Sequence, residues 1–200
     1  VTQDYKEAIK WYKLSAEQED AKAQYNLGVM YHQGKGVPQE NREAIKWYRK
    51  AADQGSIFAQ SQLGWIYFNG NGVERNDREA VKWHRKAAVQ GDGDAQCQLG
   101  NHYARGLGVR EDYTESFKWF SLAAEQGVTS AQCALSLLYA EGLGVEECCV
   151  KAYKWVSIAT TIDSYEDELE IKHMLEGQMT SIQIAEAKEL AKNWTEKLRK

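Results

Sequence analysis

Residues 23–55 read AQYNLGVMYHQGKGVPQENREAIKWYRKAADQG, and the frame of this stretch recurs along most of the chain. Tryptophans mark the recurrence, because they fall at positions 11, 47, 83, 119 and 155, a constant spacing of 36 residues. A leucine, a tyrosine and a Gly-x-Gly pair repeat at the same spacing. A fixed period of this length indicates stacked copies of one supersecondary element. We therefore interpret the chain as a solenoid before considering any segment as a catalytic motif.

Each repeat predicts two helices joined by a glycine turn. Ala23, Leu27 and Tyr31 recur at i, i+4 and i+8, which gives a first helix of about 13 residues an apolar stripe. Gly34 and Gly36 then break this helix, because glycine enters left-handed backbone conformations at little energetic cost. We call the helix before the turn helix A and the helix after it helix B.

Helix B is predicted to begin at a capping residue that is followed three positions later by glutamate. Asp and Asn side chains accept hydrogen bonds from the first backbone amides, and the glutamate complements them. These pairs are Asp4/Glu7, Glu40/Glu43, Asn76/Glu79 and Asp112/Glu115. Glu40 is the weakest of these caps, and Cys148 with Lys151 in the last repeat predicts a looser helix start. Alanines and the tryptophan form the packing face of helix B, so the five tryptophans are expected to be core, each burying about 150–250 Å².

The motif Ala-Gln-x-x-Leu-Gly-x-x-Tyr-x-x-Gly-x-Gly-Val, followed by Ala-x-Lys-Trp-Tyr, Ala-Ala and Gln-Gly, resembles the Sel1-like repeat. That family is related to tetratricopeptide repeats but has a longer turn between its helices. The match runs from Val1 to about Thr160 as a leading half repeat and four linked repeats. Val1 falls where other repeats have a valine after Gly-x-Gly, so we expect the chain to begin in the middle of a repeat. Three residues depart from the pattern: Ser116, Ser136 and His84.

The resemblance implies an all-α fold, a right-handed superhelical α/α solenoid of about 11 helices, with the repeat array over residues 1–163. Residues 164–200 are predicted to form C-terminal capping helices, as found after many Sel1-like arrays. Thr180 and Gln183 make a capping box there. The apolar stripe expected on the last helix consists of Ala187, Leu190, Ala191, Trp194 and Leu198.

Composition argues against several classes of partner. The 25 basic and 29 acidic residues give a net charge of −4 and are intermixed, so the chain has no basic footprint for nucleic acid. No apolar run approaches the roughly 18–20 residues of a membrane span, so we expect a soluble chain without membrane insertion.

The sequence predicts no catalytic residue, no cofactor and no metal site. The four cysteines (Cys97, Cys133, Cys148 and Cys149) form no CxxC pair, and we expect tolerated thiols, with a zinc site or a regulated disulfide as open alternatives. The histidines are dispersed, and His84 and His102 occupy positions that are apolar or aromatic in other repeats, which favours satisfied core histidines.

Residues that differ between repeats should face whatever the solenoid binds. In the related tetratricopeptide arrays helix A lines the concave side, and here the second repeat places Phe58, Trp65 and Phe68 off the packing stripe, within about 80° of one another. We predict that they form an apolar anchor for a partner, since exposed aromatics in a groove resemble binding hot spots. The alternative is that Trp65 and Phe68 fold onto the neighbouring repeat as additional core. The residues predicted to flank the anchor are Tyr25, Val29 and His32, with Asn101 and Arg105 as polar contacts farther along.

The function we favour is a non-enzymatic scaffold or adaptor that binds a peptide or a partner's surface on the concave face. Two alternatives stay open: a ligand-binding or enzymatic groove, and a purely structural module that self-associates. We expect a monomer. The resemblance leans towards a bacterial periplasmic or secreted protein, whereas the residues themselves do not choose a compartment.

Overall fold

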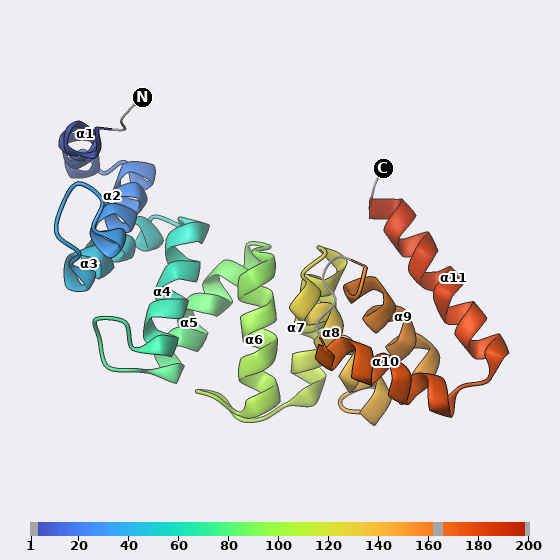
Figure 1. Ribbon diagram of the computed structural model, residues 1–200. Coiled ribbons are helices and arrows are strands. Elements are labelled where there is room, and N and C mark those ends of the chain that lie inside the picture. The colour runs from blue at the N-terminus through green and yellow to red at the C-terminus, as the bar shows by residue number, and fades with distance from the viewer. Residues whose placement is uncertain (1–3, 162–165, 199–200) are drawn as a thin grey trace. The chain divides into compact units, whose positions relative to one another are not determined.

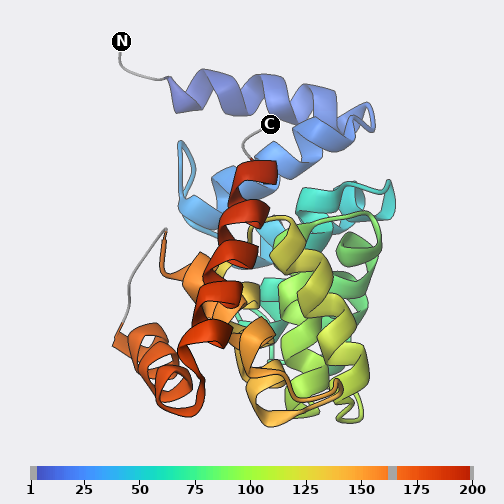
Figure 2. The same cartoon turned by 90° about the vertical axis from the view of Figure 1, so that its right-hand side faces the viewer.

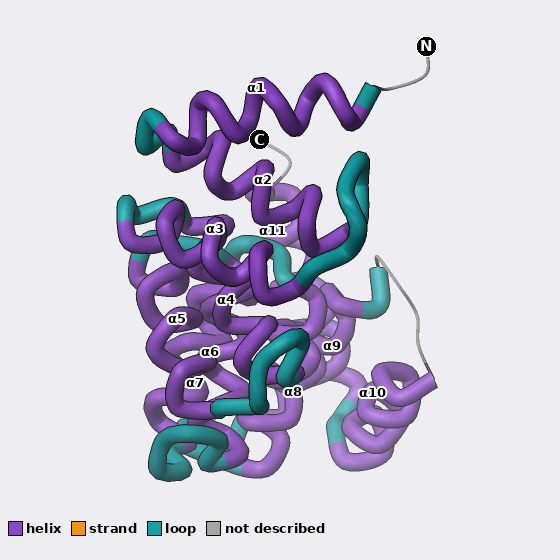
Figure 3. Tube along the Cα trace, turned by 90° about the vertical axis from the view of Figure 1, so that its left-hand side faces the viewer, coloured by secondary structure: helices purple, strands orange, loops and turns teal. Residues whose placement is uncertain are grey.

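The structure is a computed structural model that describes residues 4–161 and 166–198. Over these residues the chain folds into eleven α-helices and no strand. Figures 1 and 3 show the helices joined by loops. The helices are α1 (Tyr5–Glu17), α2 (Ala21–Gln33), α3 (Asn41–Asp53), α4 (Ile57–Asn69), α5 (Asp77–Val89), α6 (Gly93–Arg105), α7 (Tyr113–Glu125), α8 (Thr129–Glu141), α9 (Cys149–Ala159), α10 (Glu166–Gln178) and α11 (Ser181–Leu198). Helices α1 to α5 pack in chain order, and so do α7 to α10. The predicted all-α solenoid packing is confirmed.

The chain divides into two compact parts, Val1–Ala95 and Gln96–Lys200, and each is described by itself. The first part holds α1 to α5 and the start of α6. The second holds the rest of the array, α10 and the long helix α11, which is red in Figure 2. The predicted boundary between array and cap, at residues 163 and 164, lies outside the described residues.

Glycine turns end helix A as predicted. Gly34 closes α2 in the left-handed conformation with φ of 66°, and its amide donates to the carbonyl of Met30. Gly36 also has a positive φ, 74°, and a Cβ there would lie 2.7 Å from Cβ of Tyr5. Both backbone conformation and lack of space therefore require glycine at this turn.

The predicted helix caps are present with the expected differences in strength. Asp4, Asn76 and Asp112 accept first-turn amide hydrogen bonds of 3.0 to 3.1 Å. Glu40 and Cys148, in contrast, make no side-chain capping bond to α3 and α9. The glutamates of three caps also form ion pairs one turn on, Glu43 with Lys46, Glu79 with Lys82 and Glu115 with Lys118.

The tryptophans are not uniformly core, which corrects the expectation from the sequence. Trp83 and Trp155 are buried, the rings at positions 47 and 119 are half-buried, and Trp11 is 64% exposed. Trp47 packs in a cluster with Tyr12 and Ala16 of the preceding helix B. Among the described residues no helix precedes α1 to make the same contact with Trp11.

Size matching between helix A and helix B accounts for one departure from the repeat pattern, Ser136. In three repeats a glycine of helix A faces a ring of helix B, and a Cβ on Gly100 would lie 2.7 Å from Cδ1 of Phe120. The matched positions hold Gly28 with Tyr48, Gly64 with His84, Gly100 with Phe120, and Ser136 with Val156. Ser136 thus occurs where the opposite residue is the smaller valine. Its hydroxyl donates to the carbonyl of Ala152 at 2.9 Å, and Ser116 donates to Gly100 in the same way.

Buried glutamines link successive helices. Gln24 donates to the carbonyl of Ala16 at 3.1 Å, and its own Oε1 accepts from Nε2 of Gln54 at 2.8 Å. Gln60 makes the same two bonds one repeat later, with Ala52 and Gln90 at 3.0 and 2.7 Å. Because the side-chain amides of Gln24 and Gln60 are buried, each of these bonds gives a hydrogen-bonding partner to a polar group that is shielded from water.

The last helix packs on α9, but not through the whole stripe expected. Trp194 packs edge-on against Trp155 with ring centroids 5.6 Å apart, and Ala187 and Ala191 are buried. Leu190 and Leu198 are exposed, and this part of the expectation was wrong. Leu190 projects about 100° away from Ala191, and Leu198 lies in the last turn of an 18-residue helix that packs on the 11-residue α9.

Two polar contacts complete this end of the chain. The predicted capping box is present, because Thr180 and Gln183 exchange hydrogen bonds of 2.9 and 3.3 Å. Tyr153 of α9 donates to the carboxylate of Glu176 on α10 at 2.6 Å. That bond lowers the pKa of Glu176, while burial first, and then the same carboxylate, raises the pKa of Tyr153 to about 12.

Candidate binding face on helices α2 and α4

Helix α4 has a composition unlike its counterparts, because none of its residues is charged. Ser56 caps its start, and one side of the helix, including Leu63 and Ile66, is buried in the core of the first part. On the other side Phe58 is 67% exposed and Trp65 is 38% exposed. The helix therefore presents aromatic surface to solvent, a composition found at binding sites more often than on other protein surface.

Phe58 belongs to an aromatic cluster at the start of α2 and α4. Its ring lies 5.9 Å from that of Tyr25, which in turn lies 5.7 Å from the buried Tyr48. Burial raises the pKa of Tyr25, so its hydroxyl stays neutral at physiological pH. A cavity of about 570 Å³ opens beside this cluster. Its lining consists of Ala21, Lys22, Tyr25, Asn26, Gln54, Gly55, Ser56 and Phe58.

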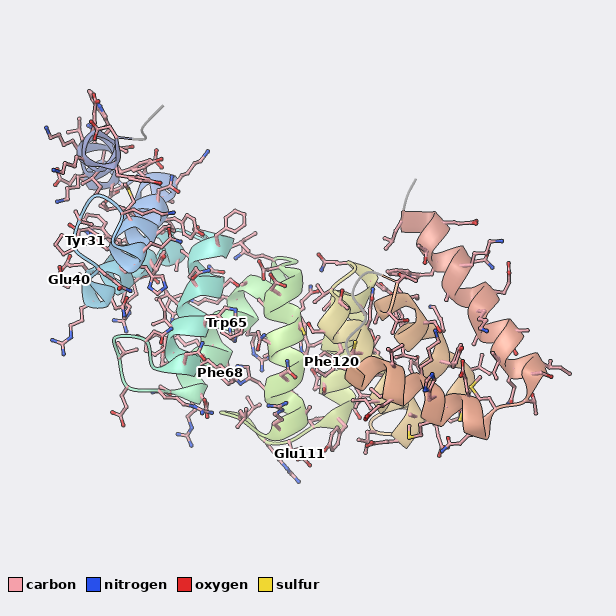
Figure 4. The ribbon with its side chains drawn as sticks, viewed as in Figure 1. Tyr31, Glu40, Trp65, Phe68, Glu111 and Phe120 are labelled. Carbon is pink, nitrogen blue, oxygen red and sulfur yellow. The ribbon has the colours of Figure 1, made fainter. Side chains whose placement is uncertain are left out.

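Trp65 and Phe68 form a second cluster farther along α4, where Figure 4 labels both side chains. Their rings meet edge-on at 6.1 Å, and Trp65 also lies 6.3 Å from the ring of His84 on α5. Phe68 is half-buried against the core and is covered by the guanidinium of Arg75 at 5.2 Å. The structure thus combines the two interpretations of the sequence, an exposed anchor and additional core. Phe68 adds to the core, and Trp65 is partly exposed.

The structure separates the predicted anchor into these two clusters. Phe58 and Trp65 are seven residues apart on one helix, which corresponds to about 10 Å. Of the flanking residues, Tyr25 joins the first cluster, Val29 packs against the core, and the imidazole Nδ1 of His32 lies 3.2 Å from Oδ1 of Asn41.

Asn101 and Arg105, the predicted polar contacts, belong to α6 in the second compact part. Asn101 is half-buried, with its amide nitrogen 4.0 Å from Sγ of Cys97, and Arg105 is exposed. Their role stays a prediction.

Sequence reasoning missed Asn26 and the turn at Gln54–Ser56 as lining residues. Asn26 lies beside Leu27 of the repeat motif and matches no binding motif itself. Residues 54–56 form the turn between two repeats, where the motif predicts only a helix end. Only the approach of two consecutive repeats brings these residues beside Tyr25 and Phe58.

Ionisable and metal-binding chemistry is not concentrated in the described residues. No group of three or more His, Cys, Asp and Glu side chains in them could hold a metal ion. His102 is a core histidine as predicted, with Nδ1 2.9 Å from the carbonyl of Leu107, and His84 is also fully buried. Within residues 4–161 and 166–198 no helix combines the length and apolarity needed to cross a bilayer.

Comparison with protein families identifies the repeat. The Sel1 repeat model matches residues 1–20, 21–56, 57–92, 93–128 and 129–161. No curated protein sequence matches the chain.

Several solved structures resemble the chain, among them three bacterial proteins. One is c5321, described as a protective antigen present in uropathogenic Escherichia coli strains displaying an SLR fold, with 40% identity and a TM-score of 0.85 over 94% of this chain and 40% of that one. A Sel1 repeat protein from Oxalobacter formigenes has 34% identity and a TM-score of 0.78, over 86% of this chain and 70% of that one. Cysteine rich protein B of Helicobacter pylori shares the fold alone, at 22% identity and a TM-score of 0.52, over 66% of this chain and 95% of that one. All three are bacterial, and the chain spans 40% of the length of the E. coli protein.

Proposed function

Because the chain belongs to the Sel1 repeat family, whose arrays are commonly protein-interaction scaffolds, we propose that it binds a peptide segment of a partner protein along helices α2 and α4. The observation that carries this proposal is the uncharged helix α4, which exposes Phe58 and Trp65 on the side away from the core. Aromatic anchors of this kind contribute much of the affinity in protein interfaces. In this proposal the chain binds and positions its partner and does not catalyse a reaction on it.

The two aromatic clusters suit an extended peptide better than a compact ligand. Their separation of about 10 Å corresponds to three residues of an extended chain, at roughly 3.3 Å per residue. A peptide could therefore place one apolar side chain beside Phe58 and another beside Trp65. The polar contacts predicted for Asn101 and Arg105, on α6 in the second compact part, form a separate proposal.

Selection from a display library tests this proposal directly. Random peptides of about 12 residues, which span up to about 40 Å when extended, are selected on the immobilised chain, and their affinities are measured by fluorescence anisotropy. Phe58→Ala and Trp65→Ala should each weaken binding about tenfold or more, because each removes an anchor. Val89→Ala is the matched control, since Val89 is also 67% exposed but lies on α5.

Thermal stability distinguishes a binding residue, Trp65, from a core residue, Trp83. Trp65→Ala should leave the helical circular dichroism and melting almost unchanged, whereas Trp83→Ala should unfold the array, because it empties a buried site at a cost of about 3–5 kcal/mol. Equal effects of the two substitutions on melting, or selected peptides that bind Phe58→Ala and Trp65→Ala as well as the wild type, would refute the proposal.

A further inference from the structure

The cavity beside Tyr25 and Phe58 has the size of a site for one large side chain and its neighbours. Its volume of about 570 Å³ lies within the range of about 300–1,000 Å³ typical of ligand pockets. The two rings, 5.9 Å apart, form one apolar side of it. The turn at residues 54–56 closes another side.

This combination of rings occurs at one junction of the array. The position of Tyr25 is held by Ser61, Cys97 and Cys133 in the later repeats. The position of Phe58 is held in the other repeats by Lys22, Asp94 and Ser130. Since the helical frame is the same in every repeat, the apolar character of this cavity comes from two residues that the frame does not require.

The charged side chain that lines the cavity is positive. Lys22 is the only charged residue that lines it, and α4 contributes no charge. The nearby carboxylate of Asp20 accepts the amides of Lys22 and Ala23 at 2.8 and 3.0 Å and the hydroxyl of Ser15 at 3.2 Å. The Asp20 carboxylate thus caps α2, and its charge also acts on Lys22 at longer range. No ion pair within 4 Å among the described residues includes the Lys22 ammonium. An acidic group on a ligand would complement it.

Asn26 supplies the hydrogen-bonding group that a peptide bond needs. Its side chain is half-buried at the cavity and makes no hydrogen bond to any described residue. A carboxamide offers a donor and an acceptor together, which matches the C=O and N–H of a peptide backbone. A lone anion would use the donor only.

We propose that this cavity selects a peptide in which an aromatic or large aliphatic side chain is followed by Asp or Glu. The apolar side chain packs against Tyr25 and Phe58, the carboxylate pairs with Nζ of Lys22, and the intervening peptide bond meets the amide of Asn26. This inference rests on the proposed function and specifies the chemistry of the partner.

The test uses the capped peptide acetyl-Gly-Ser-Phe-Glu-Ser-Gly-amide. Three matched versions replace the phenylalanine by serine, or the glutamate by glutamine or by lysine. Short peptides bind weakly, on the order of millimolar, so binding is followed by titration of the ¹⁵N-labelled chain, reading the amides of Asn26 and Phe58. The serine version should bind at least tenfold more weakly, and the glutamine version about threefold more weakly at low salt.

Protein variants assign each contact. Phe58→Ala should weaken the phenylalanine peptide at least tenfold. Lys22→Gln should bind the glutamate and glutamine versions equally, because the ion pair is then absent in both. Lys35→Gln is the matched control, since it removes the same charge from the same part of the chain but outside the cavity, and it should preserve the threefold difference.

The outcomes distinguish this inference from the proposed function. Trp65→Ala should not change binding of the short peptide, because Trp65 lies about 10 Å along α4. If library-selected peptides bind through Trp65 while the glutamate and lysine versions bind wild type alike, the proposed function stands and the acidic preference is overturned. If neither short nor selected peptides shift Asn26 or Phe58, both are overturned.

Discussion

The contact between Gly100 and Phe120 allows a sharp test of size matching. Gly100→Ala adds a Cβ that would lie 2.7, 2.8 and 2.9 Å from three ring atoms of Phe120, well inside the roughly 3.5–4.0 Å of ordinary carbon contacts. Phe120 is buried and has little room to move. Overpacking of this kind costs about 1–3 kcal/mol, while alanine gains about 1 kcal/mol over glycine in a helix. We expect a net loss of up to about 2 kcal/mol.

The decisive measurement is Gly100→Ala in a second background. Phe120→Val copies the partner that faces Ser136 in the last repeat, and there the added methyl has space. Gly100→Ala should then stabilise by about 1 kcal/mol, so the two effects should differ by about 1–3 kcal/mol. Gly177→Ala on α10 is the control, since nothing lies within 4 Å of its Cβ position and only the helix propensity should change.

Urea denaturation followed by circular dichroism and tryptophan fluorescence measures these differences. Because repeat arrays can unfold in more than one step, midpoints are compared within the same transition. If Gly100→Ala has the same effect in both backgrounds, steric matching does not explain why this position lacks a side chain, and the argument fails.

Three further predictions concern stability. Glu19 has a φ of 64° where later repeats have glycine, so Glu19→Gly should stabilise by about 1 kcal/mol through relief of strain, which a rise in the urea midpoint would show and an unchanged or lower midpoint would contradict. Gln60→Leu should cost about 1–3 kcal/mol, because the buried amide of Gln60 loses its hydrogen bonds to the carbonyl of Ala52 and from Gln90. The exposed Gln33→Leu serves as the control, and equal effects would refute the reasoning. The hydrogen bond from Tyr153 lowers the pKa of Glu176. Its contribution to the free energy of unfolding is therefore fully present above the ordinary glutamate pKa of about 4.3 and is lost as pH falls through the lowered pKa. Glu176→Gln should flatten the acid side of a plot of the urea midpoint against pH, and an unchanged slope would argue against this prediction.

The repeat period made the fold predictable from sequence. Gly34 and Gly36 fixed the turns, and the caps at Asp4 and Asn76 fixed helix starts, because these signals act within a few residues of chain. Burial was harder to predict, since it depends on neighbours in space. Trp11 carries the same local pattern as Trp83 but is exposed, because the described residues contain no helices to cover it.

The candidate face was predictable in its residue types and less so in its geometry. The aromatic excess in the second repeat was visible in Phe58, Trp65 and Phe68. Their division into two clusters was not, because it depends on the rings of Tyr25 and His84 on other helices. The cavity beside Tyr25 depends further on how closely the next turn approaches, which no local pattern encodes.

Whether size-matched residues lie within one repeat or in two repeats affects how the array can gain or lose repeats. The pairs of helix A and helix B that must agree in size, such as Gly28 with Tyr48, lie inside one repeat, and so does the bond between Gln24 and Gln54. The close contact of Gly36 with Tyr5 does cross to the preceding repeat, but this turn glycine recurs in every repeat. The polar link to the preceding repeat instead ends on a main-chain oxygen, that of Ala16, which any amino acid would supply. A block of 36 residues could therefore be duplicated or deleted at the loops with little mismatch of the helical frame. The array would change its reach along a partner, while a site built from two repeats, such as that of Tyr25 and Phe58, would persist only where both repeats stay adjacent.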